Sequence, residues 1–85
     1  MRVLVAILSL AFFSSGALAG PKCNPGPQDK WLTEAEMKAK AIAMGYAINV
    51  FKKTSGNCYE IYGKDAQGKR VEVYFNPVTG DPIKH

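Results

Sequence analysis

Apolar and polar residues alternate in two neighbouring stretches of this sequence, 58–62 and 70–75, with the period of a half-buried β-strand. The residues between them, 65–69, suit a three-residue hairpin loop in which a type I turn is followed by Gly68 in the left-handed region. That loop sets Asp65 opposite Lys69, and every other pairing follows from it. Four pairs are predicted, two on each side of the sheet: Tyr59 with Phe75 and Ile61 with Val73, then Glu60 with Tyr74 and Tyr62 with Glu72. Turn chemistry and hydrophobic alternation thus predict the same hairpin independently.

A helix is predicted before the hairpin, over Thr33–Met44. Thr33 and Glu36 have the spacing of a capping box, in which each side chain accepts a hydrogen bond from a free backbone N–H at the helix start. Met37, Ala41 and Met44 fall on one face of this helix. We therefore expect those three side chains to face the core rather than to form a methionine-rich binding groove.

The stretch 46–54 is rich in β-branched and aromatic residues and predicts a first strand. Ile48 and Val50 share one face in regular alternation, and Phe51 takes the other. Either a bulge re-aims Phe51 or one face is only half buried, and the pattern leaves both open. Residues 81–84 can add a short edge strand, where a proline is tolerated.

These elements predict an α+β fold in which one amphipathic helix packs on a three- to four-stranded antiparallel sheet. The core is expected to combine the inward residues of the hairpin with the apolar face of the helix. Its predicted members are Tyr59, Ile61, Val71, Val73, Phe75, Met37, Ala41 and Met44.

Residues 1–19 have the form of a signal peptide, with a positive residue, an apolar run and a small-x-small box that ends at Ala19. Cleavage there would leave Gly20 as the new N-terminus and place the protein in the periplasm or outside the cell, without stable membrane insertion. An uncleaved anchor is the alternative, although the run is short for a bilayer span. Residues 20–31 hold several prolines and glycines and predict an irregular N-terminal arm.

The sequence contains two cysteines, Cys23 and Cys58, and a secreted chain of this size commonly needs a disulfide. Their wide separation differs from that of a redox-active C-x-x-C pair. We therefore predict one structural bridge that tethers the arm to the body of the domain.

Few residues of the sequence are candidates for catalysis, metal binding or nucleic-acid binding. The net charge of +4 is spread along the chain rather than gathered in a stripe, which argues against nucleic-acid binding. His85 is the only histidine and stands last, so neither a metal site nor a cofactor is expected. Glu60 and Glu72 could form an acid–base pair, but ordinary cross-strand pairing explains both, and we do not expect an enzyme.

Three segments resemble the PepSY domain family: the helix end Met44-Gly45-Tyr46, the strand opening at residues 56–62, and the order D-x-x-G-x-x-V-E-V-Y-x-x-P-x-T-G over residues 65–80. The match covers residues 32–83, and 32–85 is expected to form the PepSY-like domain. Asn76 departs from the aspartate more usual in the family. The resemblance implies a non-enzymatic module that binds other proteins and restrains peptidases outside the cytoplasm.

Two functions from different classes follow. The first is an extracytoplasmic module that binds a peptidase or a membrane-associated protein through the outer sheet face or the edge at residues 81–84. The residues expected to make that contact are Glu60, Tyr62, Arg70, Glu72 and Tyr74. The alternative is a sensor or accessory domain that binds a small molecule or a metal ion for a membrane partner.

Overall fold

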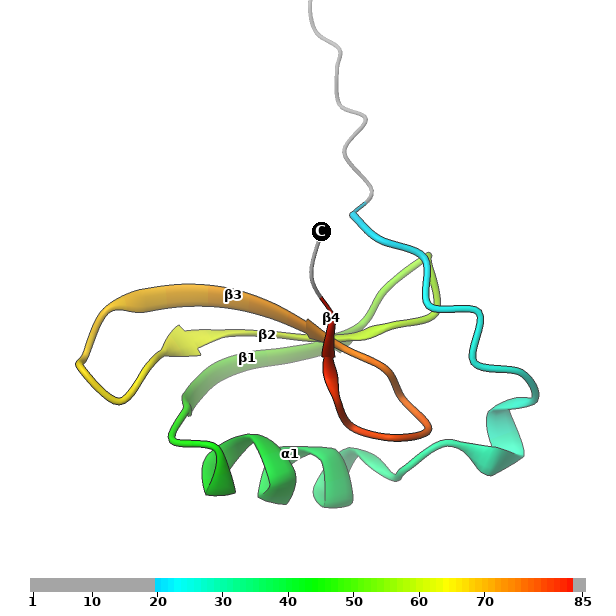
Figure 1. Cartoon of the computed structure of the whole chain (residues 1–85), viewed down its shortest axis with the longest axis horizontal. Coiled ribbons are helices and arrows are strands. Elements are labelled where there is room, and N and C mark those ends of the chain that lie inside the picture. Colours follow the sequence, from blue (N-terminus) through cyan, green and yellow to red (C-terminus); the bar gives the residue numbers. More distant parts are fainter. Residues whose placement is uncertain (1–19, 84–85) are drawn as a thin grey trace, which may run out of the picture.

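A computed structural model describes residues 20–83, which form one α-helix and a four-stranded antiparallel sheet (Figure 1). The elements are a 3-10 turn η3 (Gln28–Lys30), helix α1 (Glu34–Ala43), and strands β1 (Ala47–Lys53), β2 (Tyr59–Lys64), β3 (Arg70–Phe75) and β4 (Pro82–Ile83). The strands lie side by side in chain order, and α1 covers one face of the sheet. The α+β prediction is confirmed, with four strands. The predicted signal peptide lies outside the described residues.

The β2–β3 hairpin has the predicted register at every pair, from Tyr59 opposite Phe75 to Tyr62 opposite Glu72. The loop also has the predicted chemistry. Asp65 Oδ1 accepts hydrogen bonds from the backbone N–H groups of Gln67 and Lys69, each at 2.9 Å, and Gly68 has φ +83°. A side chain that bonds its own turn, followed by a left-handed glycine, fixes the pairing locally.

Helix α1 begins with the predicted capping box. Glu36 N donates to Thr33 Oγ1 at 3.1 Å, and Thr33 N donates to Glu36 Oε1 at 2.8 Å. Met37 and Ala41 are fully buried against the sheet. The prediction for Met44 is wrong, because this residue is the C-cap, beyond the last helical turn, and its side chain is 43% exposed.

The core joins Met37 and Ala41 to the inward residues of the hairpin, Tyr59, Ile61 and Phe75, with Val73 packed against them. The rings of Tyr46 and Phe75 meet edge to face at a centroid distance of 6.3 Å, so Tyr46 packs against the core just beyond the end of the helix. Val71 is only partly buried and lies outside this cluster, so its predicted core role is wrong. Its cross-strand neighbour is Gly63, which offers no side chain to pack against.

Strand β1 contains the bulge that the sequence left as one of two alternatives. Its register shifts between Ile48, opposite Gly63, and Val50, opposite Tyr62, so Asn49 is the extra residue. The bulge turns Phe51 toward the core and leaves Val50 49% exposed. A Cβ on Gly63 would collide with the carbonyl oxygen of Ala47, so the close approach of β1 requires glycine there.

The N-terminal arm is tied to the start of β2 by the predicted Cys23–Cys58 disulfide, with a Cα–Cα distance of 5.3 Å. Cys23 N also donates to the carbonyl of Gly56 at 2.9 Å. At the opposite end of the chain, β4 pairs Ile83 with Tyr74. The predicted edge strand therefore forms, although Lys84 lies outside the described residues.

Candidate interaction face

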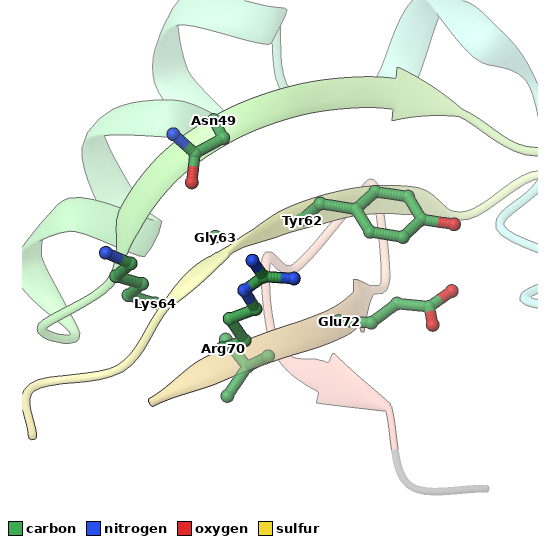
Figure 2. A pocket seen from close by; sticks show the side chains of 7 residues that line it. Asn49, Tyr62, Gly63, Lys64, Arg70 and Glu72 are labelled. Carbon is green, nitrogen blue, oxygen red and sulfur yellow. The ribbon is translucent and has the colours of Figure 1, made fainter. Parts of the chain in front are cut away.

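The sheet face turned away from α1, called the outer face below, carries a mixture of aromatic and charged side chains. Two hollows lie on it, of about 590 Å³ and 320 Å³. Tyr62 and Glu72, which are paired across β2 and β3, line both hollows and so form the wall between them. Figure 2 shows these two side chains extending in the same direction from neighbouring strands. The structure thus brings four of the predicted binding residues, Glu60, Tyr62, Glu72 and Tyr74, around the smaller hollow.

The larger hollow includes the fifth predicted residue, Arg70, whose guanidinium group lies between β3 and β2 in Figure 2. It also includes residues that the sequence analysis did not select: Asn49, Lys64 and Val71. Asn49 reaches this position because it is the bulged residue of β1. The only sequence signal for it was the break in alternation around residues 48–51.

Of the five predicted contact residues, three are exposed and two are buried. Tyr62 is 39% exposed, and Arg70 and Glu72 are exposed, whereas Glu60 is 3% and Tyr74 8% exposed. For Tyr74 the cause lies in the N-terminal arm. A Cβ placed on Gly20 would lie 2.7 Å from Tyr74 Oη, so the arm begins directly against the Tyr74 ring. The face is therefore divided into an accessible part around Tyr62 and Arg70 and a covered part around Glu60 and Tyr74.

An acidic pair, Glu60 and Glu72, lies at the boundary between the two parts, because Glu60 is buried and Glu72 is exposed. Tyr74 Oη donates to Glu72 Oε2 at 2.9 Å, and Glu60 lies opposite Tyr74 in the ladder. The pKa of Glu60 is raised, mainly by burial and further by the neighbouring Glu72. Tyr62 and Lys52 lower it by less. Burial and the same hydrogen bond also raise the pKa of Tyr74. The two glutamates therefore disfavour simultaneous ionisation.

The accessible part is suited to polar recognition. The ring of Tyr62 carries Lys52 Nζ at 5.3 Å from its centroid, which is a cation–π contact at the exposed rim. The charge of Glu60 is the main cause that raises the pKa of Tyr62, so this hydroxyl stays protonated and can donate a hydrogen bond. The ring of Tyr62, the guanidinium of Arg70 and the carboxylate of Glu72 thus lie on one surface.

Among the described residues, no group of three or more His, Cys, Asp or Glu side chains is placed to hold a metal ion. Both cysteines are in the disulfide. Within residues 20–83, no helix combines the length and apolarity that a membrane span needs. A structural disulfide is typical of proteins outside the cytoplasm.

Comparison with known proteins gives one match. The family model described as peptidase propeptide and YPEB domain, PepSY_2, matches residues 3–85. No curated protein and no solved structure matches the chain.

Proposed function

The chain belongs to the PepSY_2 family of peptidase propeptide and YPEB domains, and from this premise we propose that it is an extracytoplasmic module that binds and modulates a secreted peptidase. Domains of this family are generally non-catalytic. A peptidase as partner follows from the propeptides that share the domain. The disulfide supports a location outside the cytoplasm.

One observation carries the proposal: Tyr62 and Arg70 lie exposed beside a hollow of about 590 Å³ on a rigid sheet. Tyrosine and arginine are enriched among the residues that dominate binding energy at protein interfaces. Both side chains come from the β2–β3 hairpin, whose register is fixed by the turn and the core. A partner would therefore meet a preorganised surface and lose little free energy in ordering it.

The test is binding of the naturally processed protein to secreted peptidases of the organism that makes it, with affinity measured by calorimetry. Tyr62→Ala and Arg70→Ala should each weaken binding by at least about tenfold, as expected for interface residues worth more than ~1.4 kcal/mol. Ile42→Ala is the matched control, because Ile42 is 60% exposed on α1, the layer opposite the outer face. Equal affinity of all four proteins would reject the outer face as the binding surface.

The same samples test modulation. Addition of the wild-type protein should lower the turnover of a bound peptidase, and Tyr62→Ala should restore it at equal concentration. Binding without any change in turnover would retain the binding module and remove the peptidase-modulating role.

The small-ligand alternative rests on the larger hollow, whose volume of about 590 Å³ is in the range of small-molecule sites. Binding of a metabolite there should raise the melting temperature of the wild-type protein, since a ligand that binds only the folded state stabilises it. Arg70→Ala should abolish that shift. A screen in which no metabolite or ion raises the melting temperature would exclude the alternative.

A further inference from the structure

Within residues 20–83, strand β1 forms one edge of the sheet and pairs only with β2. In an antiparallel ladder every second residue directs its N–H and C=O away from the partner strand, so these groups of β1 face outward. No loop or helix of this part of the chain forms a backbone hydrogen bond to β1. The opposite edge, β4, has only 2 residues, whereas β1 has 7. Strand β1 is therefore the longer open edge, where a further strand can pair.

A hollow of about 510 Å³ lies beside this edge, on the α1 side of the sheet. Its walls include apolar side chains of α1, of β1 and of the residue between them: Ile42, Tyr46, Ile48 and Phe51. Ile42 is among the most exposed large apolar residues of the described chain. A strand added beside β1 would direct every second side chain toward α1, into this hollow. The hollow therefore suits an apolar side chain of such a strand.

Positive charge is concentrated at the C-terminal end of the same strand. Lys52 and Lys53 are the last residues of β1, and each ammonium group lies over an aromatic ring. Within residues 20–83 neither lysine forms an ion pair, whereas Lys38, beside the hollow, is paired with Glu34 at 2.8 Å. The buried Glu60 lies opposite Lys52 and balances part of its charge. The end of the edge is therefore positively charged and favours an acidic partner.

The same features disfavour pairing with a second copy of this chain. Pairing of two β1 strands would place the lysines of both in one short ladder, on a chain whose net charge is already positive. The bulge at Asn49 interrupts regular pairing in the first part of the strand. The regular part, residues 50–53, thus rejects a like-charged strand and remains open to a strand of opposite charge.

We propose that the β1 edge is a second binding surface, and that an extended acidic and apolar segment of another protein pairs with it as an added strand. The segment runs antiparallel to β1, as β2 does. Its apolar side chain opposite Phe51 enters the hollow, and its acidic side chains oppose Lys52 and Lys53. Main-chain hydrogen bonds hold the segment, and the hollow and the lysines select it. This surface is independent of the peptidase contact proposed for the outer face.

The probe is a capped synthetic peptide that contains the sequence Glu-Glu-Ile-Val, added to the naturally processed protein. Antiparallel pairing places its glutamates opposite Lys53 and Lys52 and its isoleucine opposite Phe51. The bound peptide should slow amide hydrogen exchange at alternate residues of β1 by at least about tenfold, because their N–H groups become hydrogen-bonded. A peptide with Lys-Lys in place of Glu-Glu should bind at least about tenfold more weakly. Backbone N-methylation of the peptide should abolish binding, since it removes the strand's donors.

Variants of the protein locate the contact. Ile42→Ala should weaken peptide binding about fivefold by removing a wall of the hollow, and should leave the peptidase contact of the outer face unchanged. Tyr62→Ala should weaken the peptidase contact and leave peptide binding unchanged. Lys53→Gln should weaken peptide binding about threefold, whereas Lys69→Gln, the same change on the exposed hairpin loop, should not.

The results that would overturn the proposal are distinct from those that would reject the peptidase contact. Equal binding of the N-methylated or the lysine peptide would exclude strand pairing at this edge. Unchanged exchange of the β1 amides at millimolar peptide would exclude the site itself. Protection of β1 that rises with the concentration of the protein alone would assign the edge to a second copy and would also overturn the proposal. Each measurement holds whether or not a peptidase binds.

Discussion

Removal of the Cys23–Cys58 bridge should cost this domain most of its stability. The two cysteines are 35 residues apart, and the chain-entropy model gives about 4 kcal/mol for a loop of that length. A domain of this size is expected to have about 3–10 kcal/mol in total. Because unfolding midpoints of such domains fall by about 4–8 °C for each kcal/mol, the melting temperature should fall by about 15–30 °C.

The assay is urea unfolding of the oxidised and the reduced wild-type protein, followed by circular dichroism. Reduction changes no side-chain volume, so it isolates the effect of the cross-link. The dependence of the unfolding free energy on urea should also become steeper, because the reduced unfolded chain exposes more surface. Cys23→Ala with Cys58→Ala should lose the same amount plus about 1 kcal/mol, since Cys58 is fully buried and its sulfur leaves a small cavity.

A loss below about 1 kcal/mol on reduction would refute this reasoning. It would mean that the unfolded chain is already compact or that the arm contributes little to the folded state. A loss of unfolding free energy well above the expected value would show that the packing of the arm on Tyr74 depends on the bridge.

Three further changes have definite expected results. Gly63→Ala should destabilise the domain by about 2–3 kcal/mol in the same urea assay, because the added Cβ collides with the β1 backbone; an unchanged midpoint would contradict the account of the bulge. Burial and Glu72 raise the pKa of Glu60, so the folded state binds its proton more tightly. Stability from this group is therefore present at low pH and is lost as the pH rises from about 4.5 through the folded-state pKa. Glu60→Gln should remove this decline, and parallel pH profiles of variant and wild type would argue against it. Thr33→Ala should cost about 1 kcal/mol through loss of the helix cap, and Thr33→Ser should restore most of it; equal stability of both variants would assign the effect to something other than the cap.

The successful predictions of the hairpin and of the helix start concern short-range chemistry. The hairpin register follows from Asp65 and Gly68, which lie within the turn itself. The capping box depends on Thr33 and Glu36, three residues apart. The disulfide partner was unambiguous because the sequence offers one pair of cysteines. The turn and the cap are decided by residues close in the sequence, which contact each other whatever the rest of the chain does. The disulfide joins residues 35 positions apart and followed from the number of cysteines alone.

The incorrect predictions concern how far the layers extend. Met44 has the right helical spacing for the core, yet the helix ends at Ala43 and the chain turns away. Val71 has the right alternation, yet it lies beside Gly63 and outside the core cluster. Periodicity gives the direction of a side chain but not the length over which a second element covers it.

The sequence by itself determined the α+β class, the pairing of β2 with β3 and the family, because alternation, turn residues and caps act over a few residues. Only the tertiary structure decided which outer-face residues are accessible. The arm contacts Tyr74 through Gly20, which lies 54 positions earlier in the sequence, and no periodic pattern encodes such a contact. The accessible part of the outer face therefore depends on the packing of the disulfide-held arm, whereas the residues of that face could be predicted from the sequence.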